Sequence, residues 1–214
     1  MAPTAPTPPP QANHDRRLLQ ARLQIVVDSL MATIIFNPLL TALCIPVFAL
    51  PGSLFGPVPL WRLLLAEGLQ LVSASVAFLV YRRFRKVELA NMDLVERLLF
   101  ISQIMISSVW GATAFLCWLP GNPVNQVFIV TQMAIVSYSS VFVRSMHRGL
   151  LTTALIVQGG LTFLRLITAS DSLAHMMAPM IVVYCSYLWM MGRGSHRQIG
   201  AMIAARFSNE DLAA

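Results

Sequence analysis

From about residue 23 onward, the chain alternates long apolar runs with short polar or basic breaks. Six of these runs reach the length of about 20 apolar residues that an α-helix needs to cross the hydrocarbon core of a bilayer. We expect membrane helices at residues 23–50, 60–81, 94–119, 124–143, 149–168 and 173–192. Only helices and closed barrels satisfy their backbone groups in lipid, and unbroken apolar runs favour helices. The pattern therefore predicts the all-α class: a polytopic membrane protein with a bundle of six transmembrane helices.

The composition favours lipid rather than water as the surroundings. Of the 214 residues, 57% are hydrophobic and 11% are charged, whereas soluble domains carry about 25% charged residues. The net charge is +6, but the basic residues lie in short clusters between apolar runs, which fits membrane topology better than a nucleic-acid surface. We therefore expect the lipid bilayer as a partner, and no nucleic acid.

The distribution of Lys and Arg predicts how the chain is oriented. With the N-terminus inside, thirteen of the fifteen basic residues fall on the cytoplasmic side, and only Arg62 and Arg165 fall on the outer half. Cytoplasmic loops carry an excess of Lys and Arg. The inner set comprises Arg16, Arg17, Arg22, Arg82, Arg83, Arg85, Lys86, Arg97, Arg144, Arg148, Arg193, Arg197 and Arg206. The sequence thus predicts that both termini are cytoplasmic.

The two ends of the chain differ from the apolar middle. Residues 1–15 are rich in Pro, Ala and Thr and are expected to form a disordered cytoplasmic tail, ahead of a transmembrane domain at residues 16–192. Residues 193–214 predict a cytoplasmic helical extension, in which Ile199, Ile203 and Phe207 recur every four residues on one face. Such a helix is typical of a signalling linker; a helix lying along the membrane surface is the alternative.

Charged residues in the outer half of the bundle are the candidate ligand-binding site. Glu67 lies five residues beyond Arg62, about 7.5 Å deeper along a helix, and Arg165 lies at a similar depth. Charged groups inside membranes usually face the bundle interior and pair. We expect a Glu67–Arg165 ion pair or a polar pocket open to the outside. Alternatively, both arginines reach the outer headgroups and Glu67 bonds internally.

Five amide side chains lie within the apolar runs, where hydrogen bonds between helices explain them without a ligand. They are Asn37, Gln70, Gln103, Gln132 and Gln158. No catalytic constellation, metal site or cofactor site is expected, because the histidines do not form a pair at matching depth and no phosphate loop or nucleophile elbow occurs. Pairing of Asp28 with Arg22 or with the basic cluster at residues 82–86 is also expected.

Several short segments carry a resemblance to a known class of protein. They are Arg16-Arg17-Leu18-Leu19, Asn37-Pro38-Leu39-Leu40, Tyr81-Arg82-Arg83-Phe84-Arg85, Val109-Trp110-Gly111 and the final run Arg206-Phe207-Ser208-Asn209-Glu210-Asp211-Leu212. Together they resemble the six-helix membrane sensor region of bacterial signalling proteins, in which the last helix leads into a GGDEF diguanylate cyclase or a histidine kinase domain. The resemblance covers residues 16–214 and lacks any output domain.

The resemblance implies a sensory domain that couples an outer or intramembrane stimulus to a cytoplasmic output through the sixth helix and its linker. It also implies the bacterial inner membrane, a homodimer and a small-molecule signal as a candidate partner. We expect either a sensor portion without its output or a stand-alone relative. A small transporter or channel is the main alternative, and an integral-membrane enzyme is a third.

Overall fold

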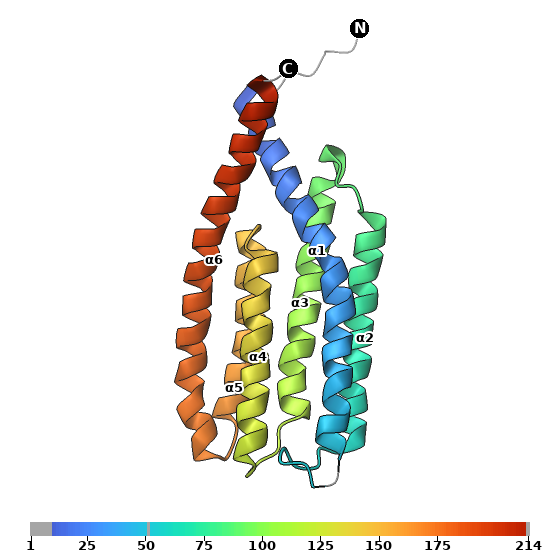
Figure 1. Ribbon diagram of the computed structural model, residues 1–214, viewed down its shortest axis with the longest axis vertical. Helices are drawn as coiled ribbons and strands as arrows, with labels where there is room; N and C mark the ends of the chain where they lie inside the picture. Colours follow the sequence, from blue (N-terminus) through green and yellow to red (C-terminus); the bar gives the residue numbers. More distant parts are fainter. Residues whose placement is uncertain (1–9, 51, 213–214) are drawn as a thin grey trace.

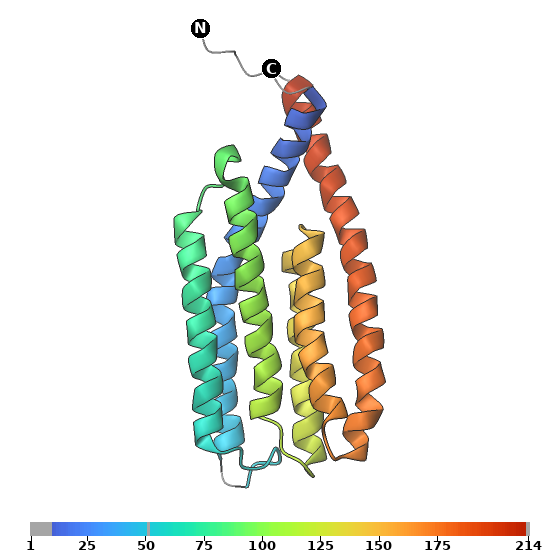
Figure 2. The same cartoon turned by 180° about the vertical axis from the view of Figure 1, so that it is seen from behind.

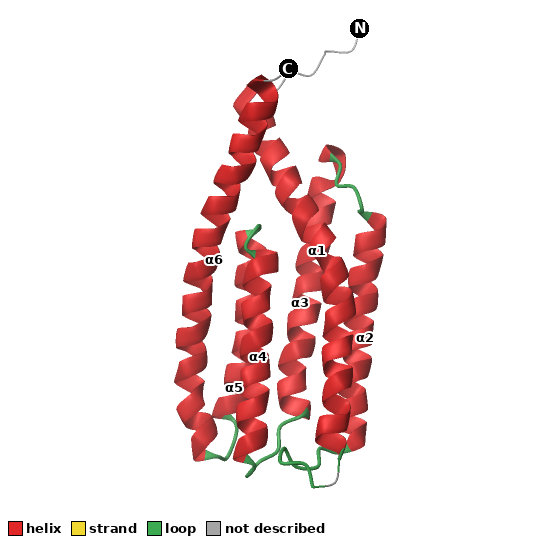
Figure 3. Ribbon diagram, viewed as in Figure 1, coloured by secondary structure: helices red, strands yellow, loops and turns green. Residues whose placement is uncertain are grey.

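The computed structural model describes residues 10–50 and 52–212, and every regular element in them is helical (Figure 3). The elements are α1 (Pro10–Ala49), α2 (Leu60–Arg83), the short 3-10 helix η1 (Leu89–Asn91), α3 (Met92–Leu116), α4 (Pro123–Arg144), α5 (Arg148–Ile167) and α6 (Ser172–Leu212). Within the described residues, six helices are long and apolar enough to cross a membrane. The prediction of an all-α bundle is confirmed, and the chain is a polytopic membrane protein.

The helix ends agree with the hydropathy pattern for α2 to α5, within a few residues. The first and last helices are longer than predicted. α1 begins at Pro10, so residues 10–15 are helical where the sequence predicted a disordered tail, and residues 1–9 lie outside the described residues. α6 continues from its apolar part to Leu212 as one helix, which matches the predicted helical extension.

The helices fall into two groups by length: those about as long as the membrane is thick, and α1 and α6, which extend beyond it. α5 has 20 residues and is about 30 Å long, the thickness of the hydrocarbon core. α1 has 40 residues and α6 has 41, so each is about 60 Å long. Both extend beyond the other helices on the same side, where they lean together (Figures 1 and 2). We call this side the terminal end, and the side with the α1–α2, α3–α4 and α5–α6 connections the far end.

The helices pack as a chain of neighbours. α1 lies on α2, α2 on α3, α3 on α5 and α5 on α6, while α4 packs against α5 and α6. α3 and α5 approach closely because Gly111 has no side chain: a Cβ at this position would lie 2.5 Å from the Cβ of Leu161. Small residues allow membrane helices to approach in this way.

Large apolar side chains also cover the outside of the bundle. Phe36 is 65% exposed, Ile156 67% and Met176 71%. These residues lie within the spans of α1, α5 and α6, so lipid chains rather than water are their natural surroundings. Inside, the aromatic rings of Phe48, Phe55 and Phe128 pack together at the far end, with centroids 4.8–5.8 Å apart.

Candidate functional site

The three charged residues predicted to form an outer pocket do lie toward the far end, but they do not form one ionic cluster. α3 lies between α2, which carries Glu67, and α5, which carries Arg165. In the described part of the chain no ion pair joins these two residues. Instead, the Arg165 guanidinium lies 5.1 Å from the ring centre of Trp118 and 5.8 Å from that of Phe115. A cation over an aromatic face is attracted by the ring quadrupole.

The remaining polar atoms of this group have few partners. Arg62 lies over the neighbouring Trp61 ring at 5.3 Å, as expected for an arginine that reaches toward the interface. The Oε2 atom of Glu67 and the Nε atom of Arg165 are buried and make no hydrogen bond in the structure. The ligand-binding role of Arg62, Glu67 and Arg165 stays a prediction, and the Glu67–Arg165 ion pair is not formed.

The polar network at the far end is built instead from the connecting loops, which we call the far-end network. Asp171 accepts hydrogen bonds from the Gly121 backbone N–H at 3.1 Å and from the Gln126 amide at 2.8 Å. Asn122 caps α4 by accepting from the Asn125 N–H at 3.0 Å, and its amide donates to the Leu54 carbonyl at 3.4 Å. The three far-end loops are thus joined through the α3–α4 turn.

The sequence predicted none of this network beyond a turn. The sequence does contain local signals for these residues. Asn122 followed by Pro123 is typical of a helix start, and Asp171 immediately before α6 is a usual capping residue. Neither signal shows which loops the side chains join, because that depends on how the helices pack.

Two of the five predicted amides form bonds between helices. The Gln158 amide donates to the Met133 carbonyl at 3.1 Å, joining α5 to α4, and the Gln132 amide lies 3.5 Å from the Cys44 sulfur on α1. Gln103 bonds within α3, to Ser107 at 2.8 Å. Gln70 is fully buried and both its amide atoms lack a partner in the structure. Asn37 borders a small polar cavity inside the bundle.

At the terminal end, His196 bonds α6 to the bundle. The Nδ1 atom of His196 lies 2.9 Å from the Ser145 carbonyl in the α4–α5 turn, and its Nε2 atom lies 3.2 Å from Nη1 of Arg22 on α1. A carbonyl only accepts and a guanidinium only donates. The two contacts therefore fit the neutral imidazole with its proton on Nδ1. We call these contacts the His196 link.

A second set of bonds attaches α1 to the loop between α2 and α3. Gln24 accepts from the Val87 N–H at 2.9 Å and donates to the Arg85 carbonyl at 3.0 Å, and Gln20 donates to the Val87 carbonyl at 2.6 Å. Asp28 accepts from Gln24 at 2.9 Å. Among the described residues, Asp28 forms no ion pair with Arg22 or the basic cluster, so that expectation is wrong; Arg22 lies against His196 instead.

A third contact joins α3 to the α4–α5 turn: Glu96 and His147 lie 3.0 Å apart. The predicted linker face lies on the part of α6 next to these links, and its role stays a prediction. Ile199 and Ile203 are half-buried on α6, and a Cβ at Gly200 would meet the Arg22 guanidinium. The side chain of Phe207 lies outside the described side chains.

From the membrane part to the exit at His196, α6 meets α5, α4 and the turn between them through small residues and three hydrogen bonds. A Cβ at Gly159 would lie 2.7 Å from the Cys185 sulfur, and one at Gly192 would collide with Leu151. Tyr184 donates to the Ala134 carbonyl at 2.8 Å, and Trp189 donates to Thr152 at 3.3 Å. The third is the His196 contact with Ser145.

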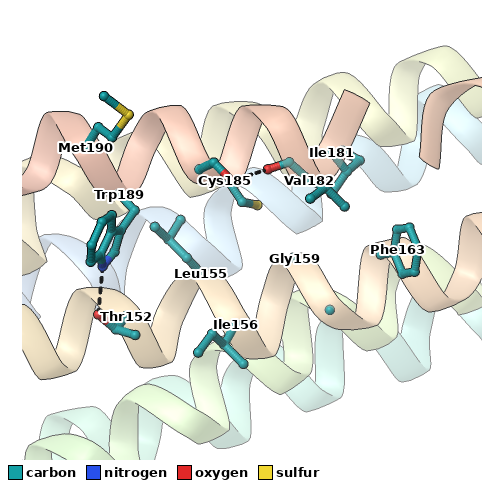
Figure 4. Close-up of a pocket in the computed structure, with 12 residues that line it drawn as sticks. Thr152, Leu155, Ile156, Gly159, Phe163, Ile181, Val182, Cys185, Trp189 and Met190 are labelled. Atoms are coloured by element: carbon teal, nitrogen blue, oxygen red, sulfur yellow. Dashed lines mark hydrogen bonds between the residues drawn. The ribbon is translucent and has the colours of Figure 1, made fainter. Parts of the chain in front are cut away.

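Between these contacts, α5 and α6 diverge enough to leave an apolar groove of about 670 Å³ (Figure 4). Ile156, Phe163, Ile181 and Met190 line it. Since this groove lies in the membrane-spanning part of both helices, it extends the lipid-facing surface inward.

Comparison with known proteins finds no family: no family model, no curated protein and no solved structure matches the chain. The geometry therefore carries the functional conclusions, together with the finding that the chain is a polytopic membrane protein with six candidate spans.

Proposed function

We propose that the chain is a signal-transmitting membrane domain, in which α6 carries a change in bundle packing to its helical extension. The supporting observation is the continuity of α6. It runs unbroken from Ser172 to Leu212, and about half its length extends past the hydrocarbon thickness. A continuous helix transmits rotation and translation, whereas a flexible linker absorbs them.

The His196 link lies where α6 leaves the bundle, so it is placed to respond to a change in helix packing. A stimulus acts on such a device only if it binds or stabilises one packing arrangement more strongly than the other. The Arg62, Glu67 and Arg165 group is our proposed place for an outer signal, since all three are charged groups near the far end and Glu67 and Arg165 each have a buried, unbonded atom.

The proposed orientation places the terminal end in the cytoplasm of a bacterial cell, with the bundle in the inner membrane. The terminal end of the bundle, with its loops and the helix ends there, carries thirteen of the fifteen basic residues, as the cytoplasmic side of a membrane protein does. Alkaline phosphatase, active only outside the cytoplasm, should be inactive when fused after Ala214 and active when inserted in the loop after Gly121. The opposite pattern would overturn the orientation.

The proposed output is a diguanylate cyclase or histidine kinase activity controlled through a homodimer, whose contact runs along the α6 extension. The test is a phase series in the full chain, with a diguanylate cyclase reporter fused after Ala214. One to seven alanines are inserted between Ala204 and Ala205. Each added residue rotates the C-terminal part of the helix and the fused reporter by about 100°. Output should therefore change several-fold with one, two or five added residues and return near four and again near seven.

The matched control carries the same number of residues as a Gly/Ser spacer directly after Ala214, where no helical phase is imposed. Output that falls smoothly with length in both series contradicts the proposal. A domain that remains monomeric in membranes under cross-linking also contradicts it.

A small-ion transporter or channel is the second candidate. The observation that favours it is the set of polar side chains inside the bundle, including Gln103, Gln158 and Arg144, which are all buried. Flux across liposomes by native protein, reduced in Glu67→Gln, would favour this function. Liposomes that stay tight with native protein would exclude it.

A further inference from the structure

A small polar cavity lies within the bundle, where α1, α3, α4 and α5 meet. Its volume is about 40 Å³, and its polar lining includes Asn37, Gln103, Ser140, Arg144 and Gln158. A cavity of this size holds two or three water molecules. It is separate from the α5–α6 groove and from the charged residues near the far end.

Arg144 is the unusual residue of this cavity. It is the last residue of α4 and only 4% exposed. Its side chain makes one hydrogen bond, a long one of 3.4 Å from Nη1 to the Ser29 hydroxyl. Among the residues that the structure describes, none forms an ion pair with it. A buried charge without a partner is strongly unfavourable, and charged residues within membrane bundles pair with a counter-charge.

Other buried polar groups around the cavity are also unsatisfied. Trp110 lines the cavity and is fully buried, and its indole N–H has no acceptor in the structure. An indole nitrogen only donates. Gln103, 3% exposed, leaves its Oε1 atom without a partner. Buried polar groups are normally bonded. Here the Trp110 indole has no acceptor, and the Arg144 guanidinium has one long hydrogen bond and no counter-charge among the described residues.

No Asp or Glu is among the residues that line the cavity. A partner that accepts hydrogen bonds, carries negative charge and fits about 40 Å³ would satisfy the donors and offset the Arg144 charge. We propose that this cavity binds one small monovalent anion of the size of chloride, held by Arg144. The site does not depend on the proposed signalling function. A bound anion would tie α4 to α1 and α3, which otherwise share few contacts with it.

The test uses full-length protein in detergent micelles and chloride as the probe. Rapid exchange of chloride with a protein site broadens its ³⁵Cl NMR signal. With native protein we expect broadening in excess of that from detergent alone. In Arg144→Gln the chloride affinity should fall about ten-fold or more, and the excess broadening with it, because a charged hydrogen-bond partner contributes at least a factor of ten in affinity. Arg97→Gln is the matched control, since Arg97 is an exposed arginine at the same end, and it should broaden chloride as native protein does.

A second variant protects the test against misfolding. Ser140 precedes Arg144 by one helical turn and lines the same cavity, so Ser140→Asp supplies a tethered carboxylate at i, i+4. This variant should fold, give no excess broadening, and have a Tm that no longer depends on chloride against gluconate at constant ionic strength. In native protein, chloride should raise the Tm by mass action.

Two results would overturn the proposal. One is equal broadening in native protein, Arg144→Gln and Ser140→Asp, which would place any chloride elsewhere. The other is competition by an anionic lipid: if phosphatidylglycerol abolishes the broadening and phosphatidylcholine does not, the occupant is a headgroup phosphate rather than a free small anion.

Discussion

The two ends of the bundle are joined in different ways. At the far end, short Asp and Asn side chains bond directly to backbone groups of neighbouring loops, through Asp171 and Asn122. At the terminal end, the links run through long side chains: Gln24 to the α2–α3 loop, Glu96 to His147, and Arg22 to His196. Long side chains lose more rotamer freedom when they are held than short ones do.

The difference indicates where this molecule can move at least cost. Three far-end loops are bonded to one another within a few residues of the helix ends. At the terminal end, α1 and α6 extend beyond the rest and approach each other through the His196 link (Figure 1). We therefore expect the projecting part of α6 to move more readily than the far-end loops. This is the arrangement that the proposed function needs.

The largest expected effect comes from separating α3 and α5, which support both ends. Gly111→Val should destabilise the bundle by about 3 kcal/mol, because overpacking of this kind costs about 1–3 kcal/mol and the new side chain meets the Cβ of Leu161. Thermal unfolding in detergent measures it. The control is Gly68→Val, where an added Cβ has no neighbour within 4 Å; an equal loss of Tm in both variants would show that close α3–α5 packing is not the cause.

The far end should be the next most sensitive region. Asp171→Ala removes the two hydrogen bonds that join the α3–α4 and α5–α6 connections, each made to a charged acceptor. A loss of about 2 kcal/mol is expected, measured as a lower Tm. Asp171→Asn keeps an acceptor oxygen and should recover part of that loss. An unchanged Tm in Asp171→Ala would mean that the far-end network does not fix the loops.

Loss of the His196 link should change stability little but should change the position of α6 relative to the bundle. His196→Ala breaks the contacts to Arg22 and Ser145 and should cost about 1 kcal/mol, the net contribution of a typical hydrogen bond, because both bonds are partly exposed to solvent. In the phase-series reporter it should nevertheless change output several-fold. His175→Ala, an exposed histidine on the same helix, is the control. Equal output in both variants and native protein would remove the His196 link from the mechanism.

The sequence predicted the helices well because each must present about 20 apolar residues to lipid. The bounds of α2 to α5 followed directly from that requirement. It could not predict that α1 begins at Pro10, since polar helical residues outside the membrane leave no hydropathy signal. Likewise, Arg144 was counted only as a basic residue at a helix end. Its burial results from the packing of α4 against neighbouring helices, which the hydropathy pattern of the sequence does not specify.

The same limit applies to the candidate site. Depth along each helix placed Glu67 and Arg165 in one layer, but depth does not say which helix lies between two others. α3 separates α2 from α5, so Arg165 packs over Trp118 instead. The periodic spacing of Ile199 and Ile203 predicts only that the two share one face of α6, because residues one turn apart on a helix do so whatever the helix packs against; their role as a signal linker stays a prediction. Both are half-buried in the structure.

The contrast between a fixed far end and a movable terminal end is tested most directly by spin-label distances in lipid bilayers. In a background where Cys44, Cys117 and Cys185 are replaced by alanine, one label pair at Arg16 and Gln198 reports the terminal end, and another at Leu60 and Ser172 reports the far end; all four positions are exposed. We predict a narrow distance distribution for the far-end pair and a broad one for the terminal-end pair. In His196→Ala, the distribution of the terminal-end pair should broaden further and that of the far-end pair should not change. Equal widths at both ends, or broadening at the far end, would contradict the account.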